Sequence, residues 1–274
     1  MPELPEVETI RVGLEPKLVG RRFERVEIFD PRLTRPYDPL EVAAELQGER
    51  IADLERRGKY LVVRFESGRV LLVHLRMTGG FRHAQGGFES DDPYRRAVVR
   101  LDDGSDVAYR DVRRFGTWLL LEPGELEPYL HTRVGEELLG RRLSAKSVQP
   151  LLSRRRAPIK AVLLDQRLFA GVGNIYADEA LWWAWIHPLR QAASLDLAEI
   201  KRLLQGVRKS LRQGIERQGA TLTHYRGVDG SSGSMQHEFR VYGRAGEPCF
   251  RCGTPIEKTR AGGRGTWFCP NCQQ

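Results

Sequence analysis

The chain opens with Met1-Pro2-Glu3-Leu4-Pro5-Glu6-Val7-Glu8-Thr9-Ile10-Arg11, the stretch around which the rest is organised. Proline suits the first turn of a helix, because its fixed φ matches the helix and no needed N–H is lost there, so Pro5 predicts a helix start. Apolar side chains follow at the spacing of one helical face: Val7, Ile10, Leu14 and Leu18. This spacing predicts an amphipathic helix with one buried face.

The same stretch carries a possible nucleophile. If Met1 is removed, which the small Pro2 permits, the chain begins with a secondary amine beside the carboxylate of Glu3. An α-amine has a reference pKa of about 7.7–8.0, so a usable fraction is neutral near pH 7. Such amines attack carbonyl-like carbons and form Schiff bases. On these residues alone, an ordinary capped helix is the more common explanation.

Segments of strand character follow the helix, separated by turns such as Asp102-Asp103-Gly104. These segments cover residues 23–29, 50–55, 60–65, 70–75, 97–101, 107–109 and 117–121. Many short strands at close spacing predict an antiparallel β-sandwich or a flattened barrel, and we expect the sandwich. Residues 39–47 interrupt them as one short helix.

The character of the chain changes at about residue 124, where helical periodicity begins. It appears in residues 144–152, 159–164, 174–185 and 197–218. Residues 221–236 are rich in glycine and serine, which predicts a mobile loop that is either functional or disordered. The expected fold is therefore α+β and multidomain, with a helix and β-sandwich in residues 1–123, a helical domain in 124–236 and a small unit in 237–274.

Composition limits the possible partners. The 274 residues are 41% hydrophobic, which is enough for two domains and a small module. The 44 Lys and Arg exceed the 36 Asp and Glu by a formal +8. This balance favours a polyanionic partner, although a solvated positive face would explain it equally well. The sequence lacks an apolar run of about 18 residues and a signal-peptide pattern, so we expect a cytoplasmic protein that does not bind membranes.

All four cysteines lie near the end of the chain, in two Cys-X-X-Cys pairs: Cys249, Cys252, Cys269 and Cys272. Each pair can turn two thiolates toward one point, and four thiolates close a tetrahedral zinc site with no open position for water. The pattern therefore predicts one structural Zn²⁺. A redox dithiol or an iron–sulfur cluster is a weaker alternative, because both pairs are present and nothing nearby indicates electron transfer.

Between the pairs, residues 254–268 have the character of two strands joined by a basic, glycine-flanked turn. Arg264 at this turn suits phosphate contact, since guanidinium donates two parallel hydrogen bonds and glycine lets a backbone come close. A plain hairpin turn is the alternative.

The start PELPEVET, with a cysteine-rich C-terminus in a chain of this length, resembles the formamidopyrimidine-DNA glycosylases, bacterial base-excision enzymes that use an N-terminal proline. The related endonuclease-eight branch has glycine where Leu4 stands, so Leu4 favours the formamidopyrimidine branch. The resemblance runs from end to end and rests on five specific motifs. It implies a helix-two-turn-helix DNA-binding domain in residues 124–236, with a lesion-capping loop at about 221–236, and a zinc-finger β-hairpin in 237–274.

The resemblance also implies catalytic roles. Pro2 corresponds to the nucleophile and Glu3 to the group that handles proton transfer at the sugar. Lys59, in Arg57-Gly58-Lys59-Tyr60, matches a lysine that points into the active site and assists at the sugar and phosphate. Arg264 matches the arginine that grips the phosphates beside the damaged nucleotide, and Lys258 is implied to lie near the lesion.

Three further motifs imply DNA contacts. His74 begins a segment similar to HLGMTG, with Arg76 in place of its first glycine, and would contact phosphate. The void left by a flipped base would be filled by Met77, Arg113 and Phe115, with Arg113 facing the orphaned cytosine.

The third motif is Gly171-Val-Gly173-Asn174, which resembles the helix-two-turn-helix entry where the asparagine contacts DNA phosphate. Two further departures accompany these matches. Trp183 and Trp185 replace an expected basic and an expected small residue, and the loop differs from the family in residues 223–226.

Taken together, the resemblance implies a bifunctional DNA glycosylase and abasic-site lyase, a cytoplasmic, nucleoid-associated monomer acting on duplex DNA with oxidised purines. A relative that prefers oxidised pyrimidines is disfavoured by Leu4 and the void-filling residues. A catalytically silent zinc-ribbon DNA-binding protein would explain the charge and the cysteines. It would not need the Pro2, Glu3 and Lys59 trio.

Overall fold

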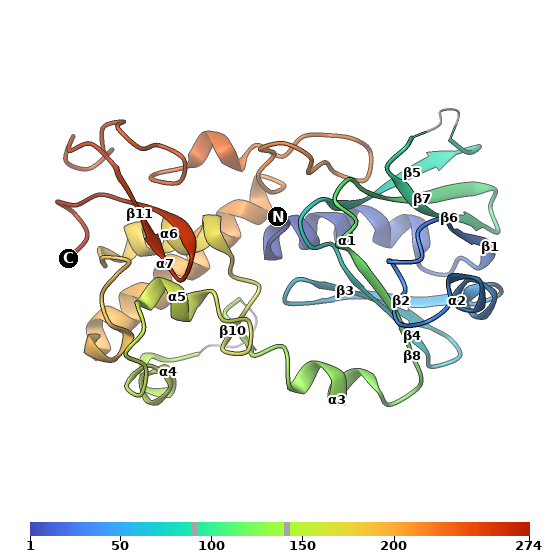
Figure 1. The fold of residues 1–274 in the computed structure, drawn as a ribbon, viewed down its shortest axis with the longest axis horizontal. Coiled ribbons are helices and arrows are strands. Elements are labelled where there is room, and N and C mark those ends of the chain that lie inside the picture. Colours follow the sequence, from blue (N-terminus) through green and yellow to red (C-terminus); the bar gives the residue numbers. More distant parts are fainter. Residues whose placement is uncertain (89–91, 140–142) are drawn as a thin grey trace. The chain divides into compact units, whose positions relative to one another are not determined.

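The computed structural model describes residues 1–88, 92–139 and 143–274 (Figure 1). Its internal contacts group the chain into two compact units. One comprises Met1–His131 with Arg217–Ser234, and the other Thr132–Glu216 with Met235–Gln274. The division into residues 1–123, 124–236 and 237–274 stays a prediction.

The first unit contains two four-stranded antiparallel sheets, with strand orders β1-β6-β7-β5 and β2-β3-β4-β8. The strands are β1 (Phe23–Ile28), β2 (Ile51–Arg57), β3 (Tyr60–Phe65), β4 (Val70–His74), β5 (Gly79–Gln85), β6 (Arg95–Leu101), β7 (Ser105–Asp111) and β8 (Thr117–Leu121). Both sheets contribute to one buried core, for example through Leu61, Val73, Ala97 and Tyr109. The predicted antiparallel sandwich is confirmed.

Strand β5 is absent from the strand segments that the sequence predicts. Within the described residues it lies at the edge of its sheet, next to β7, and it begins with Gly79-Gly80, which have no side chains to pack. Of its later side chains, Phe81 is buried whereas Arg82 and His83 are half-buried. Its alternation is therefore too weak to predict a strand, and pairing with β7 creates it.

Helix α1 (Leu4–Leu18) packs its apolar face into the same core, where Val7, Ile10 and Leu14 have no exposed surface. Its start is closed by a capping box, in which Glu3 is the N-cap and Glu6 accepts the Glu3 N–H at 2.8 Å. Such a box satisfies backbone donors that the first helical turn leaves open. Helices α2 (Pro39–Leu46) and α3 (Leu126–His131) complete this unit, and α3 was not expected from the sequence.

Two connections pass from one sheet to the other at the same end of the sandwich. One joins the end of β4 at His74 to the start of β5 at Gly79, and the other joins Asp111 of β7 to Thr117 of β8. His74 is paired with Thr117 and Gly79 with Asp111, so both ends of the two connections are neighbours. The two connections therefore lie side by side.

The loop 217–234 contains no helix or strand, but it is closely tied to this unit. Val228 is 4% exposed and belongs to the sandwich core. His83 donates its N–H to the Val228 carbonyl at 3.2 Å, and the Arg82 guanidinium donates to the Gly227 carbonyl at 2.7 Å. These contacts anchor the middle of the loop, while its mobility in solution stays a prediction.

The second unit is mainly helical. It contains α4 (Ala145–Leu152), α5 (Ile159–Leu163), α6 (Asn174–Ala184) and α7 (Leu197–Glu216), the short parallel pair β9 (Glu136–Glu137) and β10 (Phe169–Ala170), and the antiparallel hairpin β11 (Glu257–Ala261) and β12 (Arg264–Phe268). Helices α6 and α7 approach closely at Gly214, where a Cβ would lie 2.5 Å from the Tyr176 ring. None of the helices in the described ranges combines the length and apolar character that a bilayer crossing requires.

Candidate active site and zinc centre

The N-terminus of the first unit is held in place by one carboxylate. Pro2 is buried and Glu3 is 2% exposed, whereas Met1 is 43% exposed. The carboxylate of Glu6 accepts the N–H of Glu3 at 2.8 Å and the N–H of Ala220, in loop 217–234, at 2.8 Å. The residues expected to carry the chemistry therefore sit at a fixed, buried helix start that is also joined to the loop.

Lys59 lies in the turn between β2 and β3 and is 6% exposed. This turn is fastened to α1, because Arg56 forms an ion pair with Glu8 at 2.8 Å and donates to the Gly58 carbonyl at 3.0 Å. The Arg56 and Arg11 guanidiniums hold the pKa of the Glu8 carboxyl below its usual value, against the opposing effect of burial. The ion pair thus brings the Lys59 turn and the helix that carries Pro2 and Glu3 to one side of the unit.

His74 ends β4, where its strand pairs with Tyr60 at the start of β3. Burial, assisted by the nearby charges of Arg76 and Lys59, lowers the pKa of His74 to about 3. The ring is therefore neutral at pH 7, and its Nδ1 accepts the Arg76 N–H at 3.0 Å. The proton then resides on Nε2, which can donate a hydrogen bond to a phosphate oxygen.

The three residues expected to fill a base-sized void lie in the two adjacent sheet connections. Met77, half-buried, belongs to the β4–β5 connection, and Arg113 and Phe115 belong to the β7–β8 connection. Phe115 is 53% exposed, and the Arg113 guanidinium stacks on its ring at 4.8 Å. A large aromatic side chain held this far into solvent is available to a partner.

In the second unit, the predicted hairpin is confirmed. Gly262 and Gly263 turn the chain with φ of 55° and 75°, and the exposed Arg264 directly follows as the first residue of β12. Lys258 is exposed on β11, with its ammonium 5.1 Å from the centre of the Trp267 ring. Both cations therefore stand on one small, glycine-turned element.

Asn174 is the first residue of α6, directly after the N-cap Gly173. Its side-chain amide donates to the Gly265 carbonyl at 3.0 Å, so the helix start lies against the hairpin beside Arg264. The structure thus brings Asn174 and Arg264 together. The first turn of α6 and the backbone at Arg264 are therefore neighbours.

A buried ion pair that the motifs do not reveal supports this junction. Lys160 and Asp178 have fully buried side chains 2.8 Å apart, and Lys160 also donates to the Gly265 carbonyl and the Thr266 hydroxyl, each at 2.8 Å. Burial raises the pKa of Asp178 to about 7, against the opposing charge of Lys160. A lysine within the apolar run of α5 is the one sequence signal that could have indicated this pair.

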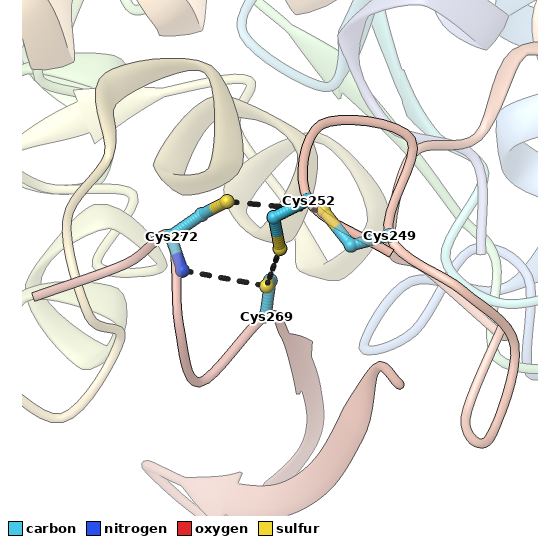
Figure 2. Close-up of side chains that lie close together, drawn as sticks. All are labelled: Cys249, Cys252, Cys269 and Cys272. Carbon is cyan, nitrogen blue, oxygen red and sulfur yellow. Dashed lines mark hydrogen bonds between the residues drawn. The ribbon is translucent and has the colours of Figure 1, made fainter. Parts of the chain in front are cut away.

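The four cysteines form a compact cluster, with all Sγ atoms within 4.8 Å of one another (Figure 2). The Cys249–Cys272 and Cys252–Cys269 sulfur distances are 4.0 and 3.5 Å. Tetrahedral Zn–S bonds of about 2.3 Å place sulfurs about 3.8 Å apart, so these residues fit zinc. The Trp182 indole and the Arg251 N–H both donate to the Cys249 sulfur, at 3.4 and 3.5 Å. The chain holds one structural zinc at this site, and no position remains for substrate.

The two unexpected tryptophans pack against cations. The Arg251 guanidinium lies between Trp182 and Trp185, at 3.6 and 3.9 Å from their rings, and donates to the Trp182 carbonyl at 2.6 Å. The Lys209 ammonium lies 3.3 Å from the centre of the Trp183 ring. The Arg251 contacts fasten the cysteine segment to the end of α6, and the Lys209 contact joins α7 to α6.

Three family models match the chain in succession. They describe the N-terminal domain of formamidopyrimidine-DNA glycosylase over residues 1–118, its H2TH domain over 134–226, and the zinc finger found in FPG and IleRS over 246–274. The chain belongs to the formamidopyrimidine-DNA glycosylase family. The predicted family, fold and zinc site are confirmed.

Curated relatives agree over the full length. The formamidopyrimidine-DNA glycosylase of Symbiobacterium thermophilum is 48% identical, over 100% of this chain and 89% of the relative. That of Herpetosiphon aurantiacus is 44% identical over 100% of both chains.

Solved structures agree as well. The Lactococcus lactis Fpg, in complex with DNA containing an abasic site, superposes with a TM-score of 0.92 at 37% identity, covering 99% of both chains. MutM in complex with DNA containing carbocyclic 8-oxo-G gives a TM-score of 0.92 at 38% identity, covering 100% of both chains.

Proposed function

We propose that this member of the family is a bifunctional DNA glycosylase and abasic-site lyase that removes 8-oxoguanine and formamidopyrimidines from duplex DNA. The observation that carries the proposal is the buried Pro2-Glu3 start of α1 in a chain that matches the family from end to end. Solved relatives bind DNA with an abasic site, Fapy-dG or carbocyclic 8-oxo-G, which supports these substrates. Cytoplasmic, nucleoid-associated action as a monomer belongs to the same proposal.

The proposed chemistry begins after Met1 has been removed, because its amide bond otherwise occupies the Pro2 nitrogen. The free amine attacks C1′ of the flipped nucleotide, and the bond from C1′ to the base breaks. The sugar ring opens and a Schiff base forms between C1′ and Pro2. Successive β- and δ-elimination then breaks the phosphodiester bonds on both sides of the sugar. Glu3 transfers protons at the sugar, where its adjacency to Pro2 places it without further preorganisation.

Two buried groups near α1 assist at the sugar and phosphate. Lys59 supplies a positive charge on the turn that the Glu8–Arg56 ion pair fastens to α1. His74 is neutral and offers Nε2–H, so it can bind a phosphate oxygen without adding a second charge beside Lys59. In this proposal, one cation and one neutral donor contact the backbone of the damaged nucleotide.

The side chains of Met77, Arg113 and Phe115 in the two sheet connections fill the void that the flipped base leaves. Met77 and Phe115 are apolar and wedge into the base stack, while Arg113 can hydrogen-bond to the orphaned cytosine. The contacts of such wedges with the neighbouring bases offset part of the energy lost when a base is unstacked.

The second unit contributes phosphate contacts. Arg264 offers a bidentate guanidinium to the phosphates beside the lesion, and Lys258 on the same hairpin lies near the damaged nucleotide. Asn174 contributes the positive start of α6, where its side chain already joins Gly265. The zinc site shapes the hairpin and takes no part in bond breaking.

Borohydride trapping tests the proposal. The purified protein is mixed with duplex DNA containing one 8-oxoguanine opposite cytosine, reductant is added, and the covalent adduct is located by peptide mass. We expect an adduct on a peptide that begins at Pro2, and its loss in Glu3→Gln. Tight binding without an adduct, in protein whose Pro2 is free, would instead support a silent zinc-ribbon binder. Faster trapping on a duplex with an oxidised pyrimidine would reassign the substrate.

A further inference from the structure

The two sheet connections that carry Met77, Arg113 and Phe115 share a single buried anchor. We propose that Asp111 and Thr78 are positioning residues that join these connections, so that the three side chains enter the DNA stack as one preformed wedge. The inference rests on the proposed function, because it specifies how the base-sized void is filled.

Asp111 is the centre of the anchor and is 1% exposed. Its carboxylate accepts the N–H of Gly116 at 2.7 Å and that of Arg113 at 3.2 Å, both in the β7–β8 connection. It also accepts the hydroxyl of Thr78, in the β4–β5 connection. Hydrogen bonds to an ionised acceptor are stronger than neutral ones, so this carboxylate ties together both connections.

Thr78 joins the β4–β5 connection to the β7–β8 connection through its hydroxyl. Its hydroxyl oxygen accepts the Arg113 N–H at 2.9 Å while its proton is donated to Asp111. The residue directly after Met77 is therefore bonded to the backbone of Arg113, two residues before Phe115. A displacement of either connection breaks bonds to the other.

The Tyr109 side chain supports both connections at the ends joined by Asp111 and Thr78. The Tyr109 hydroxyl fills the space where a side chain would stand at both Gly79 and Gly116, so the ends of the two connections close on the same group. Tyr109 is itself fully buried and packs edge-on against Phe81 at 5.1 Å and Trp118 at 5.6 Å. The connections therefore rest on the packed aromatic core of the sandwich and not on a flexible surface.

Each connection also contains an arginine in the left-handed backbone region, directly before its apolar wedge residue. Arg76 precedes Met77 with φ of 53°, and Arg114 precedes Phe115 with φ of 60°. Left-handed backbone is unfavourable for an arginine, so surrounding contacts must hold it. Arg114 is held by two hydrogen bonds to Asp30, at 2.6 and 2.7 Å, and thus orients Phe115 from within the protein.

Preorganisation explains why such a link is useful. Two independent connections would each lose conformational freedom when DNA binds, and this loss reduces affinity. A wedge whose connections are already joined loses less conformational freedom on binding. This advantage increases affinity only for DNA with a void or an extruded base, because only such DNA accepts the wedge. The link should therefore raise selectivity for damaged over intact duplex, rather than affinity for DNA in general.

The test compares Thr78→Val, which keeps the shape but loses the hydroxyl, with Thr78→Ser, which keeps the hydroxyl. Affinity is measured for a duplex with a tetrahydrofuran abasic analogue opposite cytosine and for the matching intact duplex. Fluorescence of 2-aminopurine beside the analogue reports wedge insertion. We expect Thr78→Val to reduce the ratio of the two affinities about tenfold, the size of one lost charged hydrogen bond, and to reduce the insertion signal. Thr78→Ser should restore both.

A double-mutant cycle with Met77→Ala and Phe115→Ala gives a second measurement in proteins with an intact link. If the wedge acts as one unit, the two losses of selectivity are not additive when Thr78 is present. Additive losses with Thr78 present, or equal selectivity of Thr78→Val and Thr78→Ser, would overturn the inference. If thermal unfolding shows that Thr78→Val folds poorly, the double-mutant cycle alone tests the inference. If the unmodified protein does not prefer the abasic duplex at all, the proposed function fails instead.

Discussion

The buried Lys160–Asp178 pair allows a quantitative prediction, because its two partners can be removed separately and together. In Lys160→Met, the methionine fills the space of the lysine stem, but the ammonium and its bonds to Asp178, Gly265 and Thr266 are lost. Asp178 then remains buried without its cation, and its pKa, already about 7 beside Lys160, rises further. The Trp267 N–H, which it accepts at 3.1 Å, cannot replace that charge.

The magnitude follows from the burial of both side chains. Removing one partner of a fully buried pair costs about 3–5 kcal/mol, because the other charge stays desolvated and uncompensated. Replacing both partners with apolar residues of similar volume is close to neutral for the same reason. We therefore expect Lys160→Met to lower the free energy of unfolding by about 3–5 kcal/mol, and Lys160→Met with Asp178→Leu to recover most of that loss.

Urea unfolding at constant zinc concentration measures these differences, with Asp178→Leu alone completing the cycle. A loss of this size corresponds to a decrease in Tm of about 10 °C for a chain of this length. Because Lys160 and Asp178 hold β12, Lys160→Met should also weaken binding to duplex DNA through the displaced Arg264 hairpin. A loss below about 1 kcal/mol, or a double variant as unstable as Lys160→Met, would refute the reasoning about uncompensated charge.

Four further predictions concern the zinc, the pH dependence and the site. Cys249→Ser should reduce bound zinc from one per chain toward zero and weaken duplex binding, and full zinc content in this variant would contradict a four-cysteine site. The folded pKa of His74, about 3, lies below the ordinary 6.5, so the unfolded chain binds a proton that the folded chain does not. The free energy of unfolding should therefore fall as pH decreases from about 6.5 toward 3. His74→Asn should reduce this dependence on pH, measured by urea unfolding at several pH values. An unchanged dependence would exclude His74 as its source. Glu3→Gln should abolish strand cleavage while duplex affinity changes little, as followed on gels, whereas loss of binding would make Glu3 a structural residue. Arg264→Ala should weaken duplex binding at least tenfold, the effect of losing about 1.5–3 kcal/mol from a charged hydrogen bond, and should reduce the salt dependence of binding; unchanged affinity would remove Arg264 from the interface.

Local patterns in the sequence predicted most of the elements. The apolar period of α1, the strand segments of the sandwich and the spacing of the cysteine pairs each depend on residues near one another in the chain. Residue type and short spacing are sufficient for such features, since 3.6-residue and two-residue periods or a Cys-X-X-Cys turn are local properties. The resemblance then added roles that no period can express, for Pro2, Glu3 and Lys59.

The tertiary structure decided the features that depend on distant partners. Strand β5 exists because β7 pairs with it, and the loop 217–234 joins the first unit through Glu6 and Val228. Lys160 meets Thr266 across 106 positions, and Thr78 meets Asp111 across 33. Which polar groups become buried together follows from how the sheets and helices pack, because a hydrogen bond excluded from water forms only between groups that the whole fold brings into contact. The sequence alone therefore determined most of the elements and the zinc ligands, and the packing of those elements decided the remaining strand and which side chains support the site.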